Sequence, residues 1–201
     1  PVILSDGNVM FGNDNGTLNI ISKDKGIKLN SFPISIATGD NPVSRMVDIT
    51  STPILDYNTV YVMPYGGKTK ALDLSSKQQI WEKDIQGYRD MAQDSSHLYL
   101  VTNKSKVVAL NKYSGQTYWV QKKLLGRTLS APAILDNKYL VVGDYAGYVH
   151  FISLETGELL GRTKITGSPI NAPASIYKNL AILNAVNGKI VALSVRKTNL
   201  K

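Results

Sequence analysis

The chain has 201 residues, no cysteine, two histidines and a formal net charge of +8 from 23 basic and 15 acidic side chains. A chain of this length can bury a substantial core, and a hydrophobic content of 43% excludes a disordered tail. The lack of cysteine excludes disulfides, thiolate metal sites and cysteine nucleophiles, and no apolar run approaches the roughly 20 residues of a membrane-spanning helix.

The positive charge is concentrated in the second half of the chain. Residues 1–100 carry 9 basic and 11 acidic side chains, whereas residues 101–201 carry 14 and 4. The basic residues are mostly isolated from one another, while nucleic-acid-binding segments usually contain dense basic runs with interleaved aromatic residues. We therefore predict no nucleic-acid partner and a basic surface that faces solvent or a protein partner.

A sequence pattern recurs along the chain about every 40 residues, a period typical of propellers and solenoids. A proline followed by an apolar run precedes a glycine by 14 or 15 residues. The pairs are Pro1 and Gly16, Pro53 and Gly67, Pro132 and Gly147, and Pro173 and Gly188. A further unit begins near Met91, lacks the proline and has Ser105 at the glycine position.

Each complete unit is predicted to form four short β-strands. In the unit that begins at Pro132, apolar or alternating segments occupy 133–135, 139–142, 148–154 and 158–165, with turns rich in Asp, Asn and Gly between them. These short runs of Val, Ile, Leu and Tyr are typical of hairpins, and no segment keeps a helical period. The predicted fold is an all-β propeller of four-stranded antiparallel blades.

The units are predicted at 1–34, 53–86, 91–124, 132–165 and 173–195. The first connection is longer than the others by about eleven residues, which defines a loop insertion at 35–50 and suggests a binding face, where repeat proteins place their insertions. We predict one propeller segment over 1–195, followed by a basic tail at 196–201.

The last unit has room for only three strands. A closed propeller commonly completes its final blade with a strand from the other end of the chain, but Pro1 leads directly into a first strand. We therefore expect an arc of about five blades from a larger ring, with the other blades upstream.

We predict no catalytic, cofactor-binding or metal-binding residues. His97 and His150 lie in no cluster with metal-ligand spacing, and His150, in an alternating strand, is expected to be structural. Asp14 begins an Asp-Asn-Gly sequence that matches only part of a calcium loop. Nucleophile-elbow and phosphate-loop motifs are absent from the sequence.

Trp81 and Trp119 occupy the same position in consecutive units, fourteen residues after the glycine position. Such an indole could stack on a planar cofactor or pack between neighbouring blades. We predict packing, because a fixed aromatic residue in each repeat is typical of contacts between repeats.

Two segments, 71–81 and 109–119, resemble the Ala-x-Asp-x-x-Thr-Gly-x-x-x-Trp signature of quinoprotein-type, PQQ-like propeller repeats. That family includes quinone-dependent dehydrogenases and non-catalytic scaffolds. The dehydrogenases of this family contain an adjacent pair of cysteines, which this chain lacks.

Nearly the whole chain is similar to the carboxy-terminal half of the BamB family, the propeller lipoproteins of the bacterial outer-membrane β-barrel assembly machinery. The resemblance rests on the segments 37–53, 71–74, 124–127 and 140–150. It implies an eight-bladed ring at the periplasmic face of the outer membrane, attached through an upstream lipid anchor. The implied partners are the periplasmic POTRA domains of the barrel subunit BamA, the other assembly subunits and unfolded outer-membrane proteins.

The same resemblance implies that the residues that contact the partner are Arg45, Asp48 and Thr50 in the insertion. The family has an acidic pair before Thr-Thr-Pro; Asp48 matches its first member, and Thr50 replaces its second. An alternative is that Asp48 and Thr50 only cap the turn into the strand at Pro53.

Three functions remain open on the sequence. We favour a non-enzymatic scaffold that assists insertion of β-barrel proteins into the outer membrane. The alternatives are a PQQ-dependent dehydrogenase-like domain, which cofactor-dependent turnover would reveal, and a polyanion-binding module, which salt-dependent retention on immobilised polyanion would reveal.

Overall fold

The structure, a computed structural model, describes residues 1–35 and 47–196. Within these ranges the chain forms five antiparallel β-sheets and no α-helix, so no described segment is a helix able to cross a membrane. Four sheets have four strands and the fifth has three. The prediction of an all-β propeller segment made of antiparallel blades is confirmed.

We number the sheets as blades 1 to 5 in chain order. Blade 1 contains β1 (Val2–Ile3), β2 (Val9–Gly12), β3 (Thr17–Ile21) and β4 (Lys28–Pro33). Blade 2 contains β5 (Ile54–Asp56), β6 (Thr59–Val62), β7 (Thr69–Asp73) and β8 (Gln79–Lys83). Blade 3 contains β9 (Ala92–Gln93), β10 (His97–Val101), β11 (Val107–Asn111) and β12 (Thr117–Gln121). Blade 4 contains β13 (Ala133–Leu135), β14 (Tyr139–Gly143), β15 (Tyr148–Ser153) and β16 (Leu159–Lys164). Blade 5 contains β17 (Ser175–Tyr177), β18 (Leu180–Asn184) and β19 (Ile190–Leu193).

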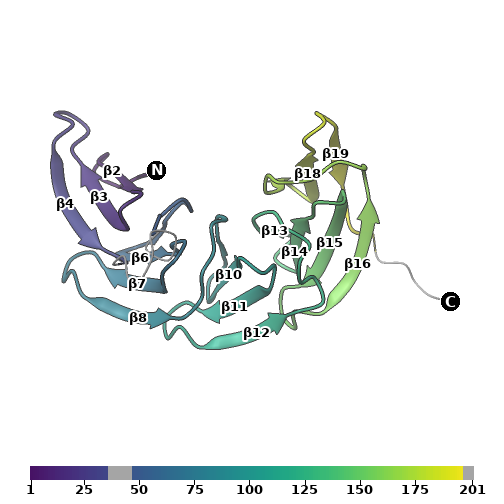
Figure 1. Ribbon diagram of the computed structural model, residues 1–201, viewed down its shortest axis with the longest axis horizontal. Helices are drawn as coiled ribbons and strands as arrows, with labels where there is room; N and C mark the ends of the chain where they lie inside the picture. The colour runs from purple at the N-terminus through teal and green to yellow at the C-terminus, as the bar shows by residue number, and fades with distance from the viewer. Residues whose placement is uncertain (36–46, 197–201) are drawn as a thin grey trace, which may run out of the picture.

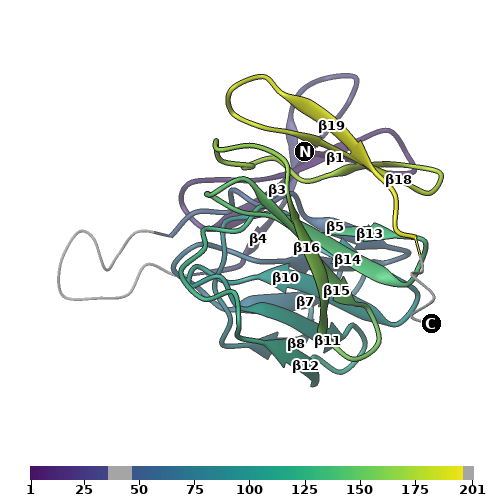
Figure 2. The ribbon, with the colours of Figure 1, turned by 90° about the vertical axis from the view of Figure 1, so that its right-hand side faces the viewer.

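The blades follow one another around an open arc (Figure 1). The fourth strand of each complete blade, β4, β8, β12 or β16, lies on the convex outer side of the arc. Figure 2, turned by 90°, shows the four strands of blade 4 side by side. Every blade pairs its strands in sequence order, so all of its hairpin turns connect neighbouring strands.

The cores lie between blades, and the middle strands are buried on both faces. Leu98 and Leu100 of β10 pack in the cluster shared with blade 2, whereas Tyr99 and Val101 pack in the cluster shared with blade 4. Side chains alternate across a strand, so a strand between two neighbours has to be apolar at every position. This explains why residues Leu98–Val101 of β10 form a continuous hydrophobic run.

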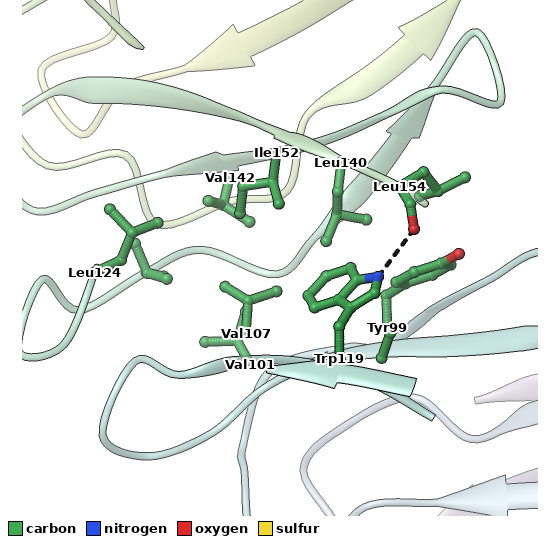
Figure 3. Close-up of a cluster of buried hydrophobic side chains, with 11 residues drawn as sticks. Tyr99, Val101, Val107, Trp119, Leu124, Leu140, Val142, Ile152 and Leu154 are labelled. Atoms are coloured by element: carbon green, nitrogen blue, oxygen red, sulfur yellow. Dashed lines mark hydrogen bonds between the residues drawn. The ribbon is translucent and has the colours of Figure 1, made fainter. Parts of the chain in front are cut away.

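Trp119 connects blade 3 to blade 4 (Figure 3). Its indole is buried against Tyr99 and Leu140, and its Nε1 donates a hydrogen bond of 3.0 Å to the carbonyl oxygen of Leu154. The ring lies under the turn between β15 and β16, where a Cβ on Gly157 would stand 2.6 Å from the indole. Gly157 also has a φ of +73°, so this turn of blade 4 favours glycine for two independent reasons.

The same arrangement joins blade 2 to blade 3. Trp81 Nε1 donates to the carbonyl oxygen of Lys112 over 2.8 Å, and a Cβ on Gly115 would stand 2.7 Å from the indole. Each tryptophan therefore fastens the last strand of its own blade to a turn of the next one.

Parts of two predicted segments lie outside the described residues. Of the insertion at 35–50, the structure describes residue 35 and residues 47–50, and of the tail at 196–201 it describes residue 196. Arg45 is outside the described residues.

Candidate partner-binding surface

The end of the insertion is fixed between blades 1 and 2. Asp48 and Tyr65 form an antiparallel bridge, in which each backbone N–H donates to the other residue's carbonyl oxygen, at 3.2 and 2.7 Å. The next amide, that of Ile49, donates to the carbonyl oxygen of Asn13 over 3.1 Å. The segment is thus held by backbone hydrogen bonds to the β2–β3 turn on one side and to the β6–β7 connection on the other.

The side chain of Ile49 packs against blade 1. It is buried and packs on Gly12, where an added Cβ would stand 2.2 Å from the isoleucine Cγ2. Blade 4 repeats this contact with Gly143 and Ile170, at 2.4 Å, and the Ile170 amide donates to the carbonyl oxygen of Asp144. This contact between isoleucine and glycine is therefore a structural feature of the repeat, and it fixes the positions of the residues on either side of Ile49.

Asp48 and Thr50 lie on the outer side of this segment. Because side chains alternate in extended backbone, burial of Val47 and Ile49 leaves Asp48 partly exposed and Thr50 exposed. Tyr65, 40% exposed, is the bridge partner of Asp48. Tyr88, 38% exposed, offers its carbonyl oxygen to the Thr50 hydroxyl at 3.5 Å.

We call Asp48, Thr50, Tyr65, Tyr88 and Arg89 the rim surface. The guanidinium of Arg89 lies 4.7 Å from the centre of the Tyr88 ring, and its Nη1 donates to the carbonyl oxygen of Asn171 at 3.4 Å. Arg89 thereby joins the connection between blades 2 and 3 to the connection between blades 4 and 5. Aromatic residues and arginine are enriched at protein interfaces, so the rim surface has the composition of a protein-binding site.

The turn into β5 is fastened by other residues. The buried Ser51 hydroxyl donates to the carbonyl oxygen of Met63 at 2.6 Å, and Thr52 N–H donates to Asp90 Oδ1 at 2.6 Å. Ser51 and Thr52 therefore hold the start of this blade through bonds that do not involve the side chains of Asp48 and Thr50.

Arg45, Asp48 and Thr50 are predicted from the sequence as partner contacts, whereas Tyr65, Tyr88 and Arg89 are not. Tyr88 and Arg89 lie in the connection between the second and third units, which is equivalent to the insertion after the first unit. Alignment of the connections, rather than of the strands, is the signal that could have found them. No sequence pattern indicates Tyr65, because only its backbone bridge to Asp48 brings it into the rim surface.

A buried polar network lies at the equivalent position of blade 4. Asp144, fully buried, accepts hydrogen bonds from Arg127 Nε at 2.5 Å and from the amides of Ala146 and Tyr148. Its Oδ2 also lies 2.7 Å from His150 Nε2. Burial alone would raise the pKa of Asp144, but the bonds from His150, Tyr148 and Arg127 outweigh it, and the pKa lies below its ordinary value.

His150 is neutral at pH 7. Burial lowers its pKa from 6.5, and the raising effect of the Asp144 carboxylate does not compensate. A neutral imidazole whose Nε2–H donates to ionised Asp144 fits the 2.7 Å distance. The position agrees with a structural histidine held inside the blade.

This histidine predicts a pH-dependent stability. As pH falls below about 6.5, the unfolded chain binds a proton at His150 while the folded chain does not. The free energy of unfolding therefore decreases, by up to about 1.4 kcal/mol per pH unit, until the pH reaches the pKa of His150 in the folded chain. Chemical unfolding between pH 5 and pH 7 measures this slope. We expect His150→Gln to reduce the slope by the contribution of one proton, whatever its effect on stability at pH 7; an unchanged slope would contradict the assignment.

Within residues 1–35 and 47–196, no three His, Asp or Glu side chains lie close enough to hold a metal ion. Asp14 lies in the β2–β3 turn. The partly exposed His97 stacks on the Tyr118 ring, with the ring centres 4.4 Å apart.

Comparison with known proteins places the sequence in a family. The model of the PQQ-like family described as "Outer membrane protein assembly factor BamB" matches residues 1–121 and 107–201. The Legionella pneumophila protein of that name is 37% identical over 97% of this chain and 50% of its own length. The Escherichia coli protein is 31% identical over 94% of this chain and 48% of its own length. The chain thus spans about half the length of these curated relatives.

Solved structures support the fold. The crystal structure of BamB from Moraxella catarrhalis superposes with a TM-score of 0.87 at 19% identity, covering 96% of this chain and 57% of the other. The computationally designed Ika8 protein gives a TM-score of 0.76 at 18% identity, covering the same shares of the two chains.

The fold and the rim surface together define a β-propeller segment of PQQ-like repeats that presents connecting segments from its blades on one face. Within this class, the chain belongs to the outer membrane protein assembly factor BamB family.

Proposed function

We propose that this chain is the carboxy-terminal part of a non-enzymatic scaffold subunit of the outer-membrane protein assembly machinery. In this proposal it binds the periplasmic POTRA domains of BamA and assists insertion of β-barrel proteins into the outer membrane. The observation that carries the proposal is the rim surface, where backbone hydrogen bonds hold Asp48 to Tyr65 of blade 2 and the adjacent Ile49 to Asn13 of blade 1. Family membership supplies the biological setting.

A fixed surface of this kind suits a scaffold. Residues that are already held in place lose little conformational freedom on binding, which lowers the entropic cost of association. Asp48, Tyr65 and Tyr88 come from three different connections. A partner that contacts all three therefore requires blades 1, 2 and 3 in their correct relative positions, rather than one flexible loop. Arg45, in the same insertion, is proposed as a further contact.

The ring and its location complete the proposal. The described arc is open (Figure 1), and the curated relatives are about twice as long as this chain. We propose that the arc forms part of an eight-bladed ring, located at the periplasmic face of the outer membrane and attached there by a lipid on the full-length protein. Other assembly subunits and unfolded outer-membrane proteins are further proposed partners.

The rim surface predicts the effect of Asp48→Arg in the full-length protein. Reversal of a charge at an interface places like charges together or removes a complementary one, which costs several kcal/mol. We expect affinity for the isolated POTRA domains of BamA to fall by about tenfold or more, measured by biolayer interferometry. The thermal midpoint should stay nearly unchanged, because the Asp48 backbone bridge to Tyr65 does not depend on the side chain.

Asp24→Arg is the matched control. Asp24 is exposed in the β3–β4 turn, at the opposite end of its blade from the β2–β3 turn that holds Ile49. Equal losses of affinity in the two variants would contradict a specific rim contact, and unchanged binding with a lowered midpoint in Asp48→Arg would assign the residue to the turn. Turnover of alcohols or sugars with added quinone cofactor and calcium would contradict the scaffold function itself.

A further inference from the structure

A groove of about 540 Å³ lies between blades 2 and 3, apart from the rim surface. One wall is formed by residues 83–86 at the end of β8, and the other by β12 and the β10–β11 turn. The amide of Asn103 donates to the carbonyl oxygen of Gln86 at 3.2 Å, which fixes the two walls relative to each other. The groove is therefore part of the blade packing.

Four lysines line the groove together with one acidic residue, Asp84. The lysines are Lys83, Lys104, Lys106 and Lys122. Among the residues that the structure describes, none of the four has a carboxylate oxygen within 4 Å of its amino group. Glu82, next in sequence to Lys83, is paired instead with Lys68 and Lys70. The groove thus carries a net positive charge that is not neutralised by nearby side chains.

This charge is not a general property of grooves between blades. The groove between blades 3 and 4 is lined by Asp94, Glu155, Lys138 and the aromatic pair His97 and Tyr118. Its acidic and basic residues nearly balance. The concentration of lysine therefore belongs to the groove between blades 2 and 3.

The floor of the groove is apolar. Val108 is buried beneath it, Val120 is 41% exposed on β12, and Ile85 lies on the opposite wall. Lining residues run from Thr117 to Lys122, a length of about 17 Å in extended backbone. A polyphosphate or a sulfated glycan would satisfy the lysines but leave this floor without an apolar partner.

We propose that this groove binds an extended acidic segment of a polypeptide that also carries apolar side chains. The lysines pair with its carboxylates, and the apolar side chains cover Val120 and Ile85. Volume, length and charge all match a short segment of such a chain. This inference goes beyond the proposed function, because it assigns a second ligand to a site that does not include Asp48 or the other rim residues.

The experiment uses the full-length protein and a fluorescein-labelled peptide of about ten residues that alternates Glu and Val. Fluorescence anisotropy gives the dissociation constant at low and high salt. We expect binding that weakens with salt, and we expect the double variant Lys104→Glu, Lys106→Glu to weaken it by about tenfold or more. The double variant Lys138→Glu, Lys189→Glu makes the same change in net charge at exposed positions elsewhere and should change affinity by less than about twofold.

The apolar floor is tested separately. Val120→Ser should weaken binding of the Glu–Val peptide by about threefold or more. A control peptide that alternates Glu and Ser should bind the parent protein more weakly, and Val120→Ser should leave its affinity unchanged. Equal losses in the two lysine double variants would overturn the proposal, because bulk charge would then explain the binding. Polyphosphate that binds as tightly as the Glu–Val peptide, with the same loss in the Lys104 and Lys106 variant, would also overturn it.

Discussion

We expect Trp119→Ala to lower the free energy of unfolding by about 3 to 5 kcal/mol, the range observed for removal of a large buried aromatic side chain. The indole fills the core between blades 3 and 4, and its loss leaves a cavity under the β15–β16 turn. The carbonyl oxygen of Leu154 also loses its hydrogen bond from Nε1, which adds the cost of an unsatisfied buried acceptor. Chemical unfolding of the full-length protein, followed by circular dichroism, measures the change.

The neighbouring Tyr118→Ala provides a matched control in the same strand. Tyr118 is 51% exposed, so its removal should cost much less than that of Trp119. Gly157→Ala tests the same contact from the turn side, because its Cβ would clash with the indole and its φ is positive; we expect a clear loss there as well. A near-neutral Trp119→Ala would contradict the packing role and restore ligand stacking as an explanation.

The second large effect is expected for Asp144→Ala, which should cost about 3 to 5 kcal/mol, as is usual when one partner of a buried ion pair is removed. Asp144 is fully buried and interacts with Arg127, His150 and two backbone amides. Its loss leaves the Arg127 guanidinium, the His150 imidazole and two backbone amides without their acceptor. Asp144→Asn keeps an oxygen for the amides of Ala146 and Tyr148 and should cost less.

Glu155→Ala is the control for Asp144, because Glu155 is exposed in the β15–β16 turn and should change stability by less than about 0.5 kcal/mol. A pH titration adds a second measure. Since the folded pKa of Asp144 is lowered, its stabilising contribution is present above about pH 4 and is lost as pH falls through the folded value. Equal stability of Asp144→Ala and the parent protein at pH 7 would contradict this role for the network.

The architecture could be predicted from sequence because its determinants are local. The proline-to-glycine spacing and the polar turns set strand length and hairpin direction, and the continuous apolar run at Leu98–Val101 shows a strand buried on both faces. The repeated positions of Trp81 and Trp119 indicated contacts between units. These signals involve neighbours in the chain or one fixed period, which a single sequence displays.

The two proposed binding surfaces depend on the tertiary structure. Tyr65 and Tyr88 join Asp48 only because a backbone bridge and the packing of blades 1 and 2 bring three connections together. Likewise, Lys83 of blade 2 meets Lys104, Lys106 and Lys122 of blade 3 across one groove, although in the sequence they are isolated basic residues. The strand period and the turn residues determine the structure of a single blade. The angle and register between blades depend on side chains that pack between them, such as Ile49 on Gly12. That packing determines which distant residues share a surface.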